Sequence, residues 1–219
     1  MDRVLLVKLD TVDSTNLEVR RRAIEGAEEG LLVLSNHQTA GRGRLGRSWD
    51  TETDSIAMSL LLRPRIAADK VSMITIIAAL AVRKAIKLIT GLDTDIKWPN
   101  DIKHENRKLA GILSESVFCG KEFYSVLGVG INVNNVSFPE ELKEIASSLR
   151  IETGEYFEKE KIVEAFCGSF FEYYDRLCED GDLRNMTEEY NSLCITEGGI
   201  NEFGELRMSD GSLKRSGEV

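Results

Sequence analysis

The sequence predicts a domain of the α+β class, in which strands and long helices share one core. Two apolar runs, at residues 31–34 and 56–62, have the length and composition of buried strands. A helix over about 69–89 is apolar on nearly every side and should therefore lie deep against a sheet. A second long helix, over about 158–178, places apolar residues three or four positions apart, the spacing of a core-facing stripe.

The first thirty residues predict a strand followed by a helix. Residues 4–9 form a short apolar run, and the Ser14-Thr15-Asn16 sequence after it offers several N-caps for a helix. Leu17, Ile24 and Ala27 fall near one stripe of this helix, so we expect that stripe to face the core.

The second half of the chain alternates strand-like and helix-like segments. Pro99 interrupts a strand-like stretch over 94–101, because proline offers no amide hydrogen to a strand ladder. Strand-like segments at 108–118 and 122–133 flank Cys119-Gly120-Lys121, which predicts a hairpin. Further helices are expected at 139–149 and 183–193, and a short strand at 206–208.

Composition limits the class of protein. A length of 219 residues suits one main domain, with room for a small appendage. The formal charge of -9, from 28 Lys+Arg against 37 Asp+Glu, argues against general attraction to a nucleic-acid backbone or an anionic membrane. The four cysteines form no C-x-x-C pair, and no apolar segment reaches the ~18 residues of a membrane span. These observations predict a soluble, cytoplasmic protein with reduced thiols.

Residues 41–49, Gly-Arg-Gly-Arg-Leu-Gly-Arg-Ser-Trp, carry the strongest functional signal, and we call them the glycine/arginine loop. Glycines let backbone N–H groups approach a ligand. Arg42, Arg44 and Arg47 offer planar, positively charged guanidinium groups, which suit binding of carboxylate and phosphate. On composition alone, a solvated surface loop or an RGG-type binder of single-stranded nucleic acid is an equal alternative.

A second candidate contact surface is the glycine-containing strand segment at 128–132. Glycines weaken a strand unless a ligand or another backbone approaches closely, so Gly128 and Gly130 predict such an approach. A β-bulge is the alternative explanation of these glycines.

The available side chains suit a reaction between two anions. Only His37 and His104 are present, and the chain has neither a G-x-S-x-G motif nor a P-loop, although a Ser-His-Asp nucleophile remains open. No metal site made by protein side chains is expected, and the expected metal is Mg²⁺ arriving with a nucleotide. The remaining cations suit adenylation, in which a carboxylate attacks the α-phosphate of ATP. They are Arg42, Arg44, Arg47, Lys97 and Lys108.

An ordered set of motifs resembles those of biotin protein ligases. The set comprises Ser14-Thr15-Asn16, Gln38, the glycine/arginine loop, Lys97-Trp98-Pro99-Asn100-Asp101, Arg107-Lys108-Leu109-Ala110-Gly111-Ile112 and Gly128-x-Gly130-Ile131-Asn132. The resemblance covers about residues 4–180. It implies a mixed β-sheet flanked by helices, related to the catalytic domains of class II aminoacyl-tRNA synthetases. It also implies that biotin and ATP form biotinyl-AMP, whose biotinyl group passes to a lysine of a biotin carboxyl carrier protein.

The resemblance implies roles for individual residues. Arg44 and Lys108 would be catalytic. The biotin-binding residues would be Ser14, Thr15, Asn16, Gln38, Gly41, Arg42, Gly43, Arg44, Trp49, Lys108, Gly111, Gly128 and Ile131. The nucleotide-binding residues would be Arg42, Arg44, Arg47, Trp49, Lys97, Asn100, Asp101, Lys108 and Asn132. The glycine/arginine loop is expected to be mobile without ligand and to close over the adenylate, because three arginines repel one another until an anion lies between them.

Two departures from the family pattern affect these expectations. Leu45 stands where many members carry another arginine. Members usually end in a small SH3-like barrel, whereas we expect residues 1–181 to form the catalytic domain and 182–219 a short, reduced SH3-like segment.

A preceding DNA-binding domain, and hence a DNA partner, is not expected, and a second copy of the chain is a candidate partner. A lipoate or octanoate ligase of the same fold, or a non-catalytic nucleotide- or RNA-binding module, are the alternative functions.

Overall fold

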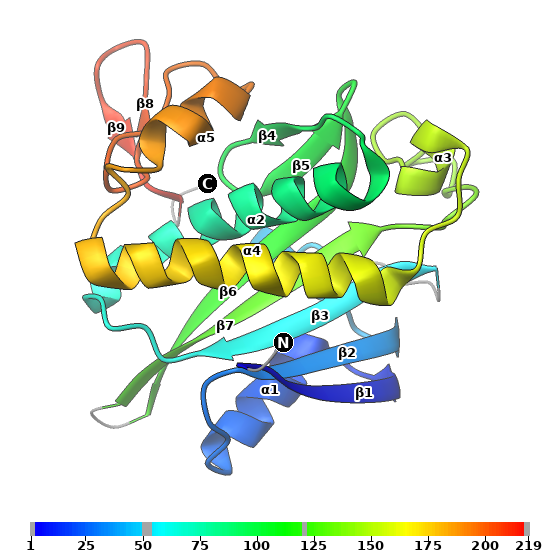
Figure 1. The fold of residues 1–219 in the computed structure, drawn as a ribbon, viewed down its shortest axis with the longest axis horizontal. Helices are drawn as coiled ribbons and strands as arrows, with labels where there is room; N and C mark the ends of the chain where they lie inside the picture. The colour runs from blue at the N-terminus through cyan, green and yellow to red at the C-terminus, as the bar shows by residue number, and fades with distance from the viewer. Residues whose placement is uncertain (1–2, 50–53, 120–121, 217–219) are drawn as a thin grey trace.

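A seven-stranded mixed sheet forms the centre of the computed structural model, which describes residues 3–49, 54–119 and 122–216 (Figure 1). Its order is β1-β2-β3-β7-β6-β5-β4, and all neighbouring pairs are antiparallel except the parallel pair β1 and β2. The strands are β1 (Leu5–Val12), β2 (Leu31–Gln38), β3 (Ser55–Leu62), β4 (Asp95–Lys97), β5 (Asp101–His104), β6 (Arg107–Cys119) and β7 (Glu122–Asn132). The predicted α+β class, with a mixed sheet flanked by helices, is confirmed.

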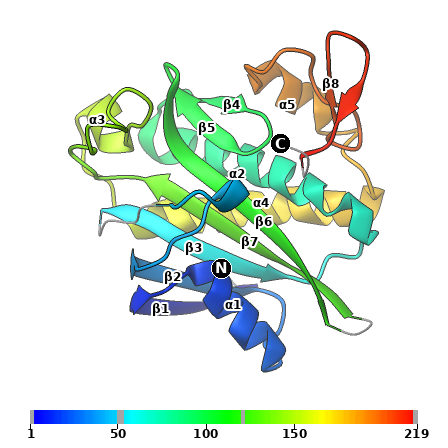
Figure 2. The same ribbon diagram turned by 180° about the vertical axis from the view of Figure 1, so that it is seen from behind.

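Helix α1 (Thr15–Ile24) connects β1 to β2, as a parallel pair requires a crossover element. It lies on the opposite face of the sheet from the two long helices (Figure 2). The predicted apolar stripe is wrong in detail: Ile24 is 65% exposed, while the buried positions include the polar Thr15 and Asn16. The first turn of α1 faces a polar pocket, so burial there does not follow hydrophobicity.

Helices α2 (Ser72–Thr90) and α4 (Lys159–Asp180) cover the other face of the sheet (Figure 1). Helix α2 packs against the sheet and against α4, and it is buried on nearly all sides, as its uniformly apolar sequence predicts. The stripe of α4 points into the same core. A short 3₁₀ turn, η2 (Ala68–Lys70), precedes α2, so the helix begins three residues after the predicted cap at Asp69.

The strand-like segments around Pro99 and Gly120 form two hairpins. Pro99, preceded by a cis peptide bond, lies in the turn between β4 and β5, so the predicted break is confirmed. The predicted β6–β7 hairpin is also confirmed, although its turn residues 120–121 lie outside the described residues. The β6–β7 register runs without interruption through Gly128 and Gly130, which makes the bulge explanation wrong.

The predicted helix over 139–149 is wrong. Residues 140–145 form turns, and the helix there, α3 (Leu149–Thr153), begins at the end of the predicted range. The backbone of this segment instead bonds to β6: Lys108 N donates to Ile145 O at 2.8 Å, and Ser147 N donates to Lys108 O at 3.0 Å. Local hydrogen bonds such as Lys143 N to Pro139 O form single turns only, and the long-range bonds to Lys108 hold the end of the segment against β6.

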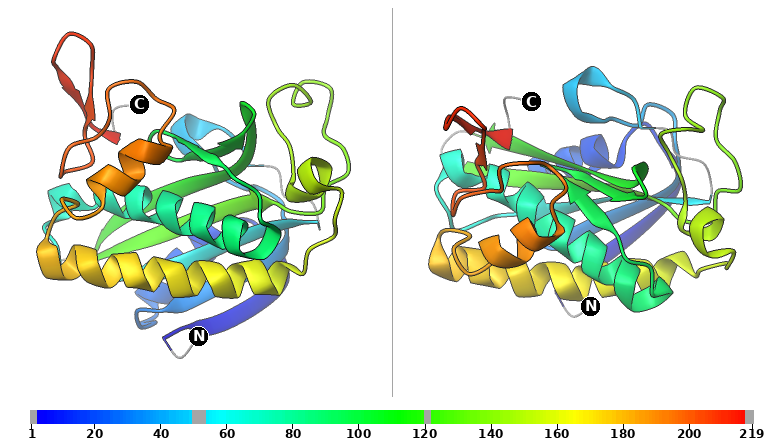
Figure 3. Two further views of the ribbon diagram at one scale, coloured as in Figure 1. Left: turned by 45° about the horizontal axis from the view of Figure 1, so that its top comes forward. Right: turned by 90° about the horizontal axis from the view of Figure 1, so that it is seen from above.

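The C-terminal part packs against one end of α2 and along β4 (Figure 3). Helix α5 (Thr187–Leu193) is shorter than predicted, and a small β-hairpin of β8 (Leu206–Arg207) and β9 (Leu213–Lys214) follows it. Leu183, Tyr190, Ile200 and Leu206 join the main core, and Ile195 N donates to Ile96 O at 2.9 Å. The domain boundary at residue 181 stays a prediction. Among the described residues, no helix combines the length and hydropathy needed to span a membrane.

Candidate functional site

The glycine/arginine loop crosses the face of the sheet opposite α2 and α4 (Figure 3, right). Its own backbone closes it: Gly43 N donates to Arg47 O at 2.7 Å and Trp49 N donates to Gly41 O at 3.0 Å. The 3₁₀ turn η1 (Arg44–Gly46) forms its tip, where Leu45 adopts a left-handed conformation with φ 55°. A Cβ on Gly41 would lie 2.2 Å from Trp49 O, so only glycine allows this closure.

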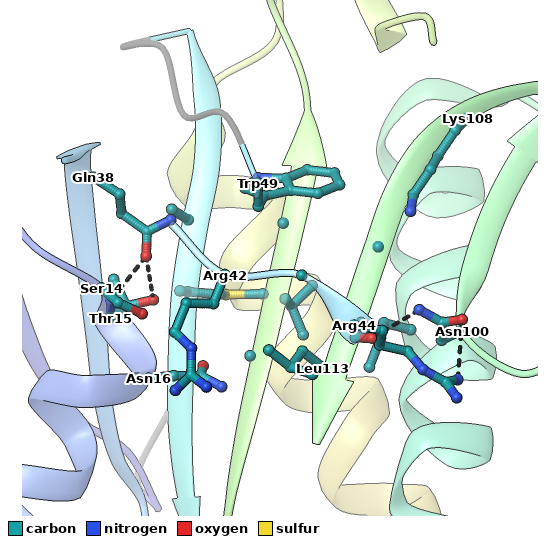
Figure 4. Close-up of a pocket in the computed structure, with 18 residues that line it drawn as sticks. Ser14, Thr15, Asn16, Gln38, Arg42, Arg44, Trp49, Asn100, Lys108 and Leu113 are labelled. Carbon is teal, nitrogen blue, oxygen red and sulfur yellow. Dashed lines mark hydrogen bonds between the residues drawn. The ribbon is translucent and has the colours of Figure 1, made fainter. Parts of the chain in front are cut away.

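Beneath the loop lies a small cavity, which we call the inner cavity (Figure 4). It leaves about 50 Å³ of free space. The sequence-predicted residues that line it are Ser14, Thr15, Asn16, Gln38, Arg42, Gly43, Arg44, Trp49, Asn100, Lys108, Gly111 and Gly128. The start of α1, the end of β2, the loop and strands β6 and β7 thus bring together side chains that are about 100 residues apart in the chain.

One end of the inner cavity is a network of buried polar side chains. Gln38 Oε1 accepts hydrogen bonds from Thr15 N at 2.8 Å and Thr15 Oγ1 at 3.1 Å. Ser59 Oγ lies 2.7 Å from Thr15 Oγ1 and 2.5 Å from Asn16 Oδ1. Since each buried partner restricts the next, the network holds donors and acceptors in fixed directions. Ser59, on β3, was not predicted from the sequence.

Glu115 is a second residue that sequence reasoning missed. Its Oε2 accepts a hydrogen bond from Asn16 Nδ2 at 2.7 Å, and its Oε1 lies 3.2 Å from Arg42 Nη1. The carboxylate therefore joins α1 to the glycine/arginine loop and sets which side of the Asn16 amide faces Ser59. Strand alternation could have identified Glu115 from the sequence. Gly111 was already predicted to belong to the site, and residues 111, 113 and 115 of β6 share one face.

The floor of the inner cavity is a flat patch of glycines. Gly111 and Gly130 are cross-strand partners, and the Trp49 indole lies over both: a Cβ on Gly130 would stand 2.3 Å from Trp49 Cε2. At Gly128, a Cβ would stand 2.3 Å from Asn16 Oδ1. Trp49 Nε1 is buried and has no hydrogen-bond partner among the described residues. The glycines thus allow the side chains of Trp49 and Asn16 to lie close against the strand backbone, as the sequence predicts.

Alternation along β7 places Ile131 away from this floor. Its side chain is fully buried in the core on the side of α2 and lines neither cavity of the site. Gly41 also lines neither cavity and acts on the site through its contacts with Gln38 and Trp49.

A larger cavity of about 390 Å³, the outer cavity, lies on the far side of Lys108 and Trp49, which line both. Four of the predicted nucleotide-binding residues line it in addition: Arg47, Lys97, Asp101 and Asn132. Arg42, Arg44 and Asn100, also predicted for the nucleotide, line the inner cavity instead. The apolar wall of the outer cavity was missed because residues 139–149 were predicted as a helix; it consists of Phe138, Pro139, Leu142, Ile145 and Ala146.

Cations gather where the two cavities meet. Lys108 Nζ lies 2.7 Å from Asp101 Oδ1 and 5.4 Å from the centre of the Trp49 ring. Arg44 Nη1 donates to Asn100 Oδ1 at 3.3 Å, and its Nη2 donates to the carbonyl of Ser216 in the C-terminal part. Burial lowers the pKa of Arg44, and Asp101 opposes that shift. A carboxylate from one cavity and a phosphate from the other could meet beside these cations.

The described residues contain no group of three or more His, Cys, Asp or Glu side chains that could hold a metal ion by themselves. Of the side chains in the described part of the chain, Asp101 is the carboxylate that lines the outer cavity. One carboxylate together with substrate phosphates suits Mg²⁺, which protein sites commonly bind in that way.

Three comparisons with known proteins agree with this geometry. Residues 9–132 match the model of the biotin/lipoate A/B protein ligase family. The bifunctional ligase/repressor BirA of Bacillus spizizenii is 43% identical over 163 residues, which cover 73% of this chain and 50% of that protein. The biotin–[acetyl-CoA-carboxylase] ligase of Mycobacterium tuberculosis is 37% identical over 142 residues, covering 62% and 51%. The chain thus spans about half the length of these curated relatives.

Among solved structures, the biotin protein ligase of Aquifex aeolicus in complex with biotin and ATP has a TM-score of 0.84 and 27% identity. The match covers 97% of this chain and 96% of that one, so the fold similarity extends through the C-terminal hairpin. The family match covers more than half of the chain and contains the β2, β3, β6 and β7 residues of both cavities. The chain therefore belongs to the biotin/lipoate A/B protein ligase family.

Proposed function

We propose that this protein is an ATP-dependent biotin protein ligase. The observation that carries the proposal is the arrangement of two cavities on either side of Lys108, one lined by fixed polar groups and the other by cations. The Aquifex aeolicus structure, which has the same fold, is described as a complex with biotin and ATP. Relatives with 37–43% identity are named as biotin ligases or as the ligase/repressor BirA.

In this proposal the inner cavity takes biotin and the outer cavity takes ATP. The cyclic urea of biotin needs partners for two N–H groups and one carbonyl, and the network of Thr15, Asn16, Gln38 and Ser59 offers fixed donors and acceptors. The indole of Trp49, now on the glycine floor, has to shift because the free space of about 50 Å³ is too small for the ligand.

The first step joins the two substrates at Lys108. A carboxylate oxygen of biotin attacks the α-phosphorus of ATP, the bond from that phosphorus to the bridging oxygen breaks, and pyrophosphate leaves with the electron pair. Lys108 and Arg44 reduce the repulsion between the two anions and stabilise the charge that spreads over the phosphoryl oxygens. Asp101 is the side chain that would hold Mg²⁺ arriving with the nucleotide, and this ion would further neutralise the phosphate charge.

The second step passes the biotinyl group to a carrier. The amine of a carrier lysine attacks the acyl carbon of biotinyl-AMP, forming an amide while AMP leaves as the phosphate. The name of the Mycobacterium tuberculosis relative, a biotin–[acetyl-CoA-carboxylase] ligase, supports a biotin carboxyl carrier protein as the acceptor. The free thiols of Cys167, Cys178 and Cys194 agree with action in the cytoplasm.

We expect biotin-dependent release of pyrophosphate from ATP. The measurement is a coupled pyrophosphate assay with biotin, lipoate and octanoate offered separately, because the matched family includes lipoate ligases. Release with lipoate or octanoate but not with biotin would reassign the substrate. Release with none of the three acids would favour a binding module that lacks chemistry.

We also expect biotin plus ATP to protect the glycine/arginine loop against trypsin. Its arginines have separate partners in the structure, with Arg42 beside Glu115 and Arg44 bonded to Asn100 and Ser216, while Arg47 is exposed. A shared phosphate can replace these contacts and order the loop around the ligand. Cleavage after Arg42, Arg44 and Arg47 is followed by mass spectrometry, with Lys161 in α4 as an internal reference site. Equal cleavage with and without ligands would show that ligand binding does not order the loop.

A further inference from the structure

Strand alternation gathers lysines on one face of the β4–β5 hairpin. Ile96 and Ile102 are cross-strand partners and are fully buried in the core. The strand residues directly next to these two isoleucines therefore point to the other face, which places Lys97, Asp101 and Lys103 together. All three line the outer cavity.

The next strand adds a further lysine to this group. Lys103 of β5 is in register with Lys108 of β6, next to an irregularity in the pairing between Ile102 and Lys103. Among the residues that the structure describes, the outer cavity is thus lined by Arg47, Lys97, Lys103 and Lys108, against one carboxylate, that of Asp101. This is a local excess of positive charge in a chain whose formal charge is -9.

Lys103 differs from Lys108 in its surroundings. Lys108 has an ion pair with Asp101, whereas the Lys103 ammonium donates to a neutral backbone oxygen, Asn106 O, at 2.8 Å. The positive charges of Lys97 and Lys108 lie close to it, and the Asp101 carboxylate is the negative group beside them. Like charges held this close to one another are unfavourable until an anion with several charges lies among them.

We propose that Lys103 binds the β- and γ-phosphates of ATP and stabilises the pyrophosphate as it leaves. The proposal rests on the proposed ligase function. Lys103 lines the outer cavity only, whereas Lys108 also faces the inner cavity from which the carboxylate arrives. In an in-line displacement the leaving group departs on the side opposite the attacking oxygen, which is the outer side. The negative charge that develops on the bridging oxygen therefore forms toward the side where Lys103 lies.

The test replaces Lys103 by methionine, which keeps the length of the side chain and removes the charge. We expect the KM for ATP to rise roughly tenfold, because the variant loses one charge-assisted hydrogen bond to the phosphates. Inhibition by added pyrophosphate should weaken by a similar factor, while the KM for biotin stays unchanged. Transfer from synthetic biotinyl-AMP to a carrier domain should proceed at the wild-type rate, because no pyrophosphate takes part in that step. Lys103→Arg should retain most of the affinity for pyrophosphate.

The matched control is Lys143→Met. The exposed Lys143 side chain pairs with Glu140, three residues earlier in the turn segment, so its replacement should have no effect on either measurement. An unchanged KM for ATP and unchanged pyrophosphate inhibition in Lys103→Met, with a lower melting temperature, would show that Lys103 only supports the turn at Asn106. Equal losses in adenylation and in transfer from biotinyl-AMP would also overturn the proposal.

Failure of the ligase function can be distinguished from failure of this inference. If the wild-type protein releases no pyrophosphate with any acid, calorimetric titration with pyrophosphate alone still tests Lys103. Binding by the wild type that is weakened in Lys103→Met and retained in Lys103→Arg supports the anion site. Equal binding by wild type and Lys103→Met overturns it.

Discussion

Replacement of Lys108 by alanine is expected to remove most biotin adenylation while the protein still folds. Its ammonium lies between the two cavities, 2.7 Å from Asp101, where the carboxylate and the α-phosphate have to meet. A cation fixed at the place where charge develops contributes far more to the rate than to stability, so we expect kcat to fall on the order of 100- to 1,000-fold. Pyrophosphate release at saturating biotin and ATP measures this effect.

Stability should change little in the same variant. The side chains of Lys108 and Asp101 are 31% and 22% exposed, so solvent screens their ion pair and its loss should cost about 1 kcal/mol or less. Lys161→Ala is the matched control, because Lys161 is exposed on α4 and pairs only locally with Glu158. A Lys108→Ala protein that adenylates biotin at the wild-type rate would remove Lys108 from the reaction, whereas one that fails to fold would show a structural role.

Gly128→Ala is expected to weaken biotin binding strongly. The added methyl group would lie 2.3 Å from Asn16 Oδ1, and Asn16 is held on its other sides by Ser59 and Glu115. The amide must leave these partners, which leaves buried polar groups unpaired at ~1–3 kcal/mol each. Loss of two such contacts corresponds to an increase in the KM for biotin on the order of 100-fold.

A second glycine provides the control for this substitution. Gly168 lies in α4, where an added Cβ meets no atom of the described residues within 4 Å, so Gly168→Ala should raise stability by about 1 kcal/mol and leave the KM for biotin unchanged. The two variants are compared by thermal unfolding and by titration of biotin in the pyrophosphate assay. Wild-type affinity for biotin in Gly128→Ala would mean that the Asn16 network is not part of the biotin site.

Sequence patterns predicted the helices and strands that carry apolar periodicity or lie between clear turn signals. The core strands β2 and β3, the helices α2 and α4 and the β6–β7 hairpin follow from such local signals. The helix predicted at 139–149 failed because long-range hydrogen bonds to Lys108 hold that segment against β6. The apolar stripe predicted for α1 was wrong because the helix buries Val19 and Ala23 and leaves Ile24 exposed, while its first turn faces polar partners in the site.

By itself, the sequence determined which functional groups this protein has: a loop that combines arginines with glycines, two lysine-containing motifs and glycines inside strands. The motif residue types were enough to indicate a site for two anionic substrates. Only the tertiary structure decided how these groups are divided between an inner and an outer cavity, with Lys108 and Trp49 between them. It also added Ser59, Glu115 and Lys103, none of which belongs to a motif. The reason is that strand register and alternation decide which distant side chains share a face, and register arises from pairing between segments far apart in the chain.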